Sequence, residues 1–142
     1  NDCVAHWRGH DDEVTLVRLP AAQPLRLYTA GRQPDVRVWA HDASGAGRWL
    51  PMVAMELDGP PTALAVEPSA RHALAATSAG SVWLIDAETT DPATQQARLI
   101  TSHTDAIVSL RFAHRGPLAA SVDARGQLIV WVARVMEPFK VV

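Results

Sequence analysis

The chain has 142 residues, of which 48% are hydrophobic and 20% are charged, and its formal net charge is −2. These values are typical of one globular domain with a sizeable core, and they give no general attraction to phosphate backbones. The single cysteine, Cys3, excludes an intrachain disulfide, and no apolar run approaches the roughly 20 residues that span a bilayer. We therefore expect an intracellular protein, in the cytoplasm, on the cytoskeleton or in the nucleus.

Short β-prone segments separated by turns fill the first third of the chain. Three of them are Val14–Leu19, Leu25–Thr29 and Asp35–Trp39, and a fourth strand is predicted near Val53–Leu57. Gly31 lies between the second and third segments, as a tight antiparallel connection favours. The pattern predicts a small antiparallel sheet.

The same arrangement recurs in the next two thirds of the chain. Trp39, Ile85 and Trp131 end the third strand of each unit and are separated by 46 residues. The other predicted strands are 61–66, 73–77, 81–85 and near 98–100, then 107–112, 118–121, 127–131 and 139–142. The last of these either completes the third unit or pairs elsewhere. Four antiparallel strands in about 45 residues are the arithmetic of a propeller blade.

The first and third units also share a sequence motif. Gly9-His10 resembles the Gly-His opening of WD repeats, Ser102-His103 is similar, and a hydroxyl residue precedes the final Trp by ten positions in both units. The resemblance implies a buried hydrogen-bonded chain of His, hydroxyl and Trp in each unit. Its members are His10, Thr29 and Trp39 in the first unit, and His103, Ser121 and Trp131 in the third.

The second unit lacks this motif. Leu57, Ala75 and Ile85 stand at its equivalent positions, so all three polar members are replaced together. Because a half-built buried polar network is costly, complete loss is what the physics favours, and we expect apolar packing alone to hold this unit. The Asp that WD repeats usually carry six residues before the Trp is also missing, since Gln33, Ala79 and Arg125 occupy that position.

The predicted fold is therefore all-β, a partial ring of three four-stranded WD-repeat blades. The blades are expected at about 8–57, 58–100 and 101–142, with residues 1–7 as the outer strand of a preceding or closing blade. Three blades leave two apolar faces without a partner. Because the chain also begins at Asn1 rather than at a methionine, we expect a segment of a longer or processed protein. More of its own chain or another subunit would complete the ring.

The resemblance implies a non-catalytic scaffold for protein–protein contacts in a multi-protein assembly. The alternatives are a reader of a peptide or nucleic-acid feature through the channel, or a non-catalytic domain of a larger enzyme. No cofactor, metal, membrane or catalytic site is predicted, and nucleic acid is disfavoured. The spacing of His6 and His10, for example, does not bring two imidazoles together on a strand.

The candidate partner contacts are Trp83, Arg32 and Arg125. Trp83 lies outside the repeated Trp position and is either an exposed contact for a partner or part of the packing between blades. Arg125 either joins Arg111 and Arg115 in a basic patch on the third blade or is simply solvated, as isolated arginines usually are.

Overall fold

The computed structural model of the chain describes residues 3, 5–22, 24–42, 44, 47–88, 97–115, 118–132 and 137–141. In these residues it contains β-strands and turns but no helix. The strands are β1 (Val14–Arg18), β2 (Arg26–Gly31), β3 (Asp35–His41), β4 (Trp49–Glu56), β5 (Pro61–Val66), β6 (His72–Thr77), β7 (Ser81–Asp86), β8 (Ala97–Ser102), β9 (Ile107–Phe112), β10 (Leu118–Asp123), β11 (Leu128–Val132) and β12 (Glu137–Val141).

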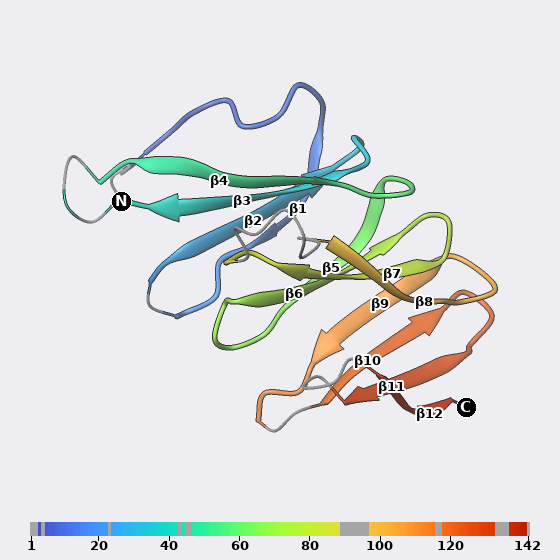
Figure 1. The fold of residues 1–142 in the computed structure, drawn as a ribbon. Helices are drawn as coiled ribbons and strands as arrows, with labels where there is room; N and C mark the ends of the chain where they lie inside the picture. The colour runs from blue at the N-terminus through green and yellow to red at the C-terminus, as the bar shows by residue number, and fades with distance from the viewer. Residues whose placement is uncertain are drawn as a thin grey trace.

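The strands form three separate four-stranded antiparallel sheets, each made of consecutive strands (Figure 1). The first sheet has the order β1-β2-β3-β4, the second β5-β6-β7-β8 and the third β9-β10-β11-β12. β12 pairs with β11, with Trp131 opposite Pro138, so the last strand completes the third sheet. Val142, the last residue of the predicted strand, lies outside the described residues.

The strand positions show the repeat directly. β2, β6 and β10 begin at residues 26, 72 and 118, which are 46 residues apart. The innermost pairing of each sheet also carries a register shift near the start of its first strand, between Val14 and Leu16 in the first sheet and between Pro61 and Ala63 in the second. The three sheets are therefore copies of one unit in bond pattern as well as in length.

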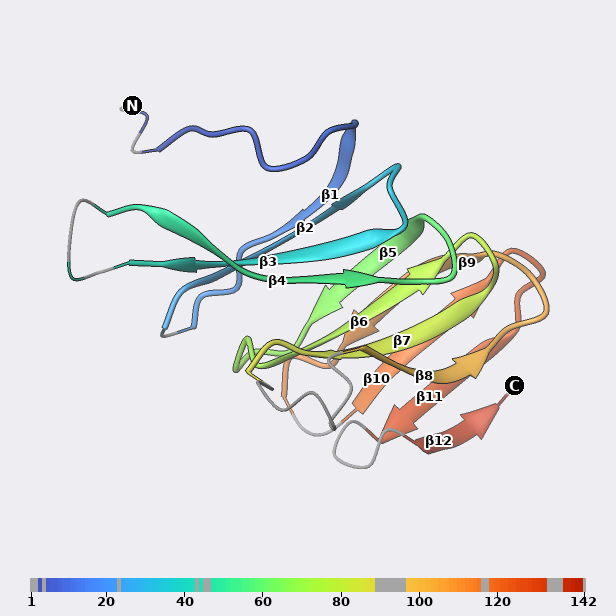
Figure 2. The same ribbon diagram turned by 45° about the horizontal axis from the view of Figure 1, so that its top comes forward.

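The second sheet lies between the first and the third (Figure 2). Two hydrophobic cores fill the spaces between the sheets, and the second sheet contributes to both. Val36 and Val38 of the first sheet pack with Ile85 of the second, while Leu74 of the second sheet packs with Trp131 of the third. The second sheet uses small side chains at these contacts, and many of its buried residues are alanines, namely Ala63, Ala65, Ala73, Ala75 and Ala76. Small residues let neighbouring sheets approach closely.

Hydrogen bonds also join the sheets. The hydroxyl of Tyr28 donates to the carbonyl oxygen of Ala70 at 2.5 Å, which links the first sheet to the second. The hydroxyl of Thr62 donates to the carbonyl oxygen of Ile107 at 3.0 Å, which links the second to the third. Gly80 adopts φ +86°, and a Cβ there would lie 2.9 Å from two carbonyl oxygens of the loop before β9. The middle sheet is thus fixed to both neighbours.

The N-terminal segment differs from the outer strand expected at residues 1–7. Cys3 and residues 5–10 are in no strand, and residues 1, 2 and 4 lie outside the described part. The Trp7 ring instead packs edge-on against Trp39 at 5.5 Å and stacks on Trp49 at 6.2 Å. Trp7 therefore covers part of the face of the first sheet that carries Trp39.

None of the described residues belongs to a helix long and apolar enough to cross a membrane.

Candidate functional site

A hydrogen-bonded chain connects three elements of the first sheet. His10 lies just before β1, Thr29 on β2 and Trp39 on β3. The indole Nε1 of Trp39 donates to Oγ1 of Thr29 at 2.9 Å, and Oγ1 lies 2.7 Å from Nε2 of His10. All three residues are buried. The structure therefore brings together the three side chains that the motif singled out in this unit.

The third sheet repeats this geometry. Nε1 of Trp131 donates to Oγ of Ser121 at 3.1 Å, and Oγ lies 2.7 Å from Nε2 of His103. This copy is more enclosed, because Trp131 is fully buried and Ser121 is 1% exposed. Its polar atoms are out of reach of solvent and depend on one another.

A carboxylate faces the other ring nitrogen of each histidine. Nδ1 of His103 lies 3.4 Å from Oδ2 of Asp123, and Nδ1 of His10 lies 4.0 Å from Oδ1 of Asp35. A hydroxyl that accepts from the indole can donate its own proton to Nε2, which leaves the imidazole proton on Nδ1, facing the carboxylate. Burial, followed by the nearby Arg37 guanidinium, lowers the pKa of His10, so this imidazole is neutral near pH 7.

Sequence reasoning missed both carboxylates. It looked for an Asp six residues before the Trp, whereas Asp35 stands four residues before Trp39 and Asp123 eight residues before Trp131. Burial raises the pKa of Asp123, but the backbone N–H groups of Gln127 and Arg125, which donate to Oδ1 at 2.8 and 3.0 Å, help to hold it below its ordinary value. The sequence signal for these carboxylates is an Asp beside the turn between the second and third strands of the sheet, at the start of β3 or at the end of β10.

The second sheet is not held by apolar packing alone, and that expectation was wrong. Asp58, which lies between β4 and β5, accepts hydrogen bonds from the hydroxyl of Thr77 at 2.8 Å, the indole of Trp83 at 3.1 Å and the hydroxyl of Ser81. Repeat spacing aligns Leu57 with the histidine, whereas the side chain that occupies this place in the structure is that of the next residue, Asp58. Burial raises the pKa of Asp58, but these three side-chain donors together hold it below the ordinary value.

The candidate contact residues are distributed over the molecule rather than gathered at one place. The indole of Trp83 is engaged by Asp58 and is half-buried. Arg32 pairs with Glu13 at 2.8 Å and Arg125 with Asp105 at 3.1 Å, both as exposed ion pairs. Arg125 lies near the start of β9, whereas Arg111 lies near its end, so these two arginines do not form a single patch.

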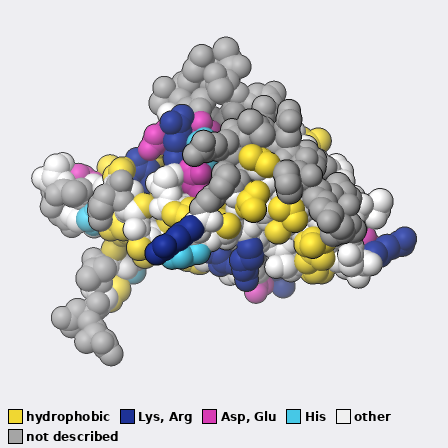
Figure 3. All heavy atoms as spheres, turned by 90° about the horizontal axis from the view of Figure 1, so that it is seen from below, with side chains coloured by type: hydrophobic (Ala, Val, Ile, Leu, Met, Phe, Trp, Pro, Cys, Tyr) yellow, Lys and Arg dark blue, Asp and Glu magenta, His cyan; other side chains and the backbone are white. Residues whose placement is uncertain are grey.

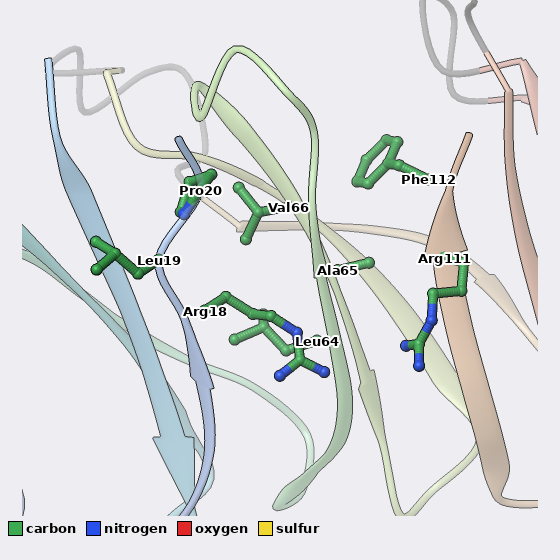
Figure 4. A pocket seen from close by; sticks show the side chains of 8 residues that line it. All are labelled: Arg18, Leu19, Pro20, Leu64, Ala65, Val66, Arg111 and Phe112. Atoms are coloured by element: carbon green, nitrogen blue, oxygen red, sulfur yellow. The ribbon is translucent and has the colours of Figure 1, made fainter. Parts of the chain in front are cut away.

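A hollow of about 330 Å³ opens where β1, β5 and β9 end (Figure 4). Its lining residues come from the innermost strand of all three sheets and from the residues that follow β1. They are Arg18, Leu19, Pro20, Leu64, Ala65, Val66, Arg111 and Phe112. The buried His and Asp58 networks lie at the opposite ends of the same strands. The hollow is thus a concave site to which all three sheets contribute.

No group of three or more His, Cys, Asp or Glu side chains that could hold a metal ion occurs among the described residues. The hydroxyls of Thr29 and Ser121 are buried and already hydrogen-bonded to both neighbours. Both hydroxyls therefore hold strands together, Thr29 in the first sheet and Ser121 in the third.

Repeated four-stranded sheets packed face to face, with their first strands on the inside, define a segment of a β-propeller. Among solved structures, one described as the structure of U3-55K is similar over 95% of this chain, with a TM-score of 0.76 at 15% identity. A crystal structure of RRP9 WD40 repeats is similar over the same share, with a TM-score of 0.76 at 13% identity. The chain has the fold of WD40 propeller blades, in a ring that the described residues do not close.

This chain spans 40% of the length of each of those two chains. No protein-family model and no curated protein matches the sequence.

Proposed function

We propose that the chain is part of a WD-repeat propeller that acts as a non-catalytic platform for protein–protein contacts in an intracellular multi-protein assembly. The observation that carries this proposal is the open ring: among the described residues the second sheet packs against another sheet on both faces, while the first and third sheets each pack against another sheet on one face. An apolar sheet face left without a partner is a binding surface. The first partner is therefore whatever completes the ring, either more of the same chain or another subunit.

The outward face of the first sheet supports this proposal. Strand residues alternate between faces, so Trp39 and Arg37 point away from the core that contains Val36 and Val38. Trp7 covers part of this face and is itself 41% exposed. Trp7 is thus the accessible aromatic side chain of this face, and aromatic side chains are enriched in protein interfaces.

The large hydrophobic side chains that remain exposed belong mainly to the two end sheets. Among the described side chains they are Val14, Val17, Leu19 and Leu50 in or next to the first sheet, and Val108 and Leu118 in the third, against Leu99 in the second. Seen from below the view of Figure 1, hydrophobic and Arg side chains lie on the same face of the molecule (Figure 3). This distribution supports partners at the end sheets and along the loops of the rim.

A reader of a peptide feature through the channel is the second candidate, and the hollow at the ends of β1, β5 and β9 favours it. A nucleic-acid partner is less well supported, because the net charge is −2 and the hollow is largely apolar.

Sedimentation velocity combined with urea denaturation tests the open ring. The isolated 142-residue chain is expected to self-associate or to unfold without cooperativity, whereas a complex that supplies further propeller blades is expected to unfold cooperatively. A monomeric 142-residue chain that unfolds in one sharp transition would contradict the proposal, because its two end faces would then need no partner.

A further inference from the structure

Two arginines occupy the same position in the repeat and face the same hollow. Arg18 is the last residue of β1 and Arg111 the last but one of β9, and the aligned residue of β5 between them is Ala65. Figure 4 shows the two guanidinium groups on either side of β5, with Leu64 and Ala65 between them. The small side chain of Ala65 leaves the space that the flanking arginines enclose.

Neither guanidinium has an acidic partner among the described residues. Nη1 of Arg18 donates to the carbonyl oxygen of Val17 at 2.8 Å, and Nη1 of Arg111 donates to that of Leu110 at 3.0 Å. By contrast, the ion pairs of the described residues include Arg32, Arg37, Arg71 and Arg125. Each hollow-lining guanidinium is therefore positioned by its own strand and keeps further N–H donors for a ligand.

The rest of the lining is apolar. Leu64 is fully buried beneath the hollow, Val66 and Phe112 are half-buried at its sides, and Leu19 is exposed at its edge. A ligand that fits must therefore present an anionic group to the arginines and an apolar group beside it. Arg binds carboxylates and phosphates through paired N–H donors, so either anion has the required chemistry.

We propose that this hollow binds an acidic peptide segment of a partner protein, in which Asp, Glu or a phosphorylated residue stands next to an aliphatic or aromatic residue. The inference rests on the proposed platform function and specifies one of its partners. Two cations above an apolar floor suit a short peptide, because a nucleic-acid backbone is held by a longer basic surface. The site lies at the end of the inner strands away from the buried His networks.

Fluorescence anisotropy of labelled peptides tests the site in the assembled protein. The probes are a peptide of alternating Glu and Leu, the same peptide with Gln for Glu, a third with phosphoserine for Glu, and a single-stranded oligonucleotide. The Glu or phosphoserine peptide is expected to bind at least tenfold more tightly than the Gln peptide and the oligonucleotide. The comparison of Glu with phosphoserine identifies which anion the site prefers.

The matched variants are Arg18→Gln with Arg111→Gln, and Arg48→Gln with Arg71→Gln, which remove the same charge from exposed arginines outside the hollow. The first pair is expected to weaken binding of the acidic peptide at least tenfold, and the second by less than twofold. Three results would overturn the site: both variant pairs weaken peptide binding equally, the Gln peptide binds as tightly as the acidic peptides, or the oligonucleotide binds more tightly than they do.

The same preparations separate this inference from the proposed function. The Arg18→Gln and Arg111→Gln double variant is expected to sediment as the wild-type assembly does. Unchanged peptide binding by an intact double-variant assembly would overturn the hollow as a site and leave the platform function standing. A wild-type chain that folds as a monomer would count against the platform function instead.

Discussion

The first and second sheets each tie their strands together with a polar network, but they use different side chains to do so. The first ties its strands with a neutral histidine, a hydroxyl and an indole, whereas the second places a carboxylate, Asp58, at the centre of two hydroxyls and an indole. Both networks lie at the start of the innermost strand. The difference teaches that the fold requires a satisfied polar network at this place, and that several sets of side chains can supply it.

The largest effect is expected from Ser121→Ala in the third sheet. This change removes the group that both Nε2 of His103 and Nε1 of Trp131 contact in a fully buried position. Each buried polar group left unpaired costs about 1–3 kcal/mol, so a loss of about 2–6 kcal/mol is expected for the two groups together. Urea denaturation of the assembled protein measures it.

The control for this change is Ser102→Ala, which removes an exposed hydroxyl at the end of β8. Its effect is expected to stay within about 0.5 kcal/mol. Equal stability of the two variants would show that the buried chain contributes nothing specific.

Asp58→Ala is expected to have the next largest effect. Thr77 and Ser81 are buried and would lose their acceptor, although Asp58 itself is exposed and water would replace part of what is lost. The expected cost is about 1–2 kcal/mol, measured by urea denaturation beside Asp11→Ala, an exposed aspartate. If Asp58→Ala were as stable as Asp11→Ala, the second sheet would after all depend on apolar packing alone.

Tyr28→Phe tests the contact between the two compared sheets. It keeps the buried ring but removes the donor to the carbonyl oxygen of Ala70. One net hydrogen bond corresponds to about 1 kcal/mol, visible as a lowered thermal midpoint. Because the bond joins the first and second sheets, hydrogen exchange should rise at the β5–β6 turn. Unchanged exchange there would indicate that this bond does not couple them.

The smallest effect is a pH dependence that distinguishes the two networks. The hydrogen bonds to Asp58 hold its folded-state pKa below the unfolded value of about 3.9, so its contribution is present above about pH 4 and lost as the pH falls through the folded pKa. The stability difference between wild type and Asp58→Asn should therefore narrow with acidification. A stability difference that stays constant from pH 7 to pH 3 would show that the negative charge of Asp58 does not contribute to stability.

His10 responds in a different pH range. Its lowered pKa means that the unfolded chain binds a proton first as the pH falls below about 6.5, so stability decreases with acidification in that range. Wild type and His10→Gln compared by urea denaturation between pH 7.5 and 5.5 would show this, and a flat difference would contradict it.

Sequence alone predicted the blades because strand periodicity and turn residues recur at 46-residue spacing. It also predicted the two His networks, since a donor-only indole, a hydroxyl and an imidazole recur together. It failed at Asp58, Asp35 and Asp123, because a carboxylate can reach the same point in space from different positions in a loop. The pair of Arg18 and Arg111 could not be predicted, because the sequence does not show that the ends of the first and third inner strands open onto one hollow.

A structure of the protein in its complete assembly tests the central claim most directly. We expect further propeller sheets against the outward face of the first sheet, which carries Trp39, and against the outer face of the third, which carries Val130. The inner strands β1, β5 and β9 should line a shared channel. Both faces in contact with solvent, or three sheets closed on one another, would contradict the account.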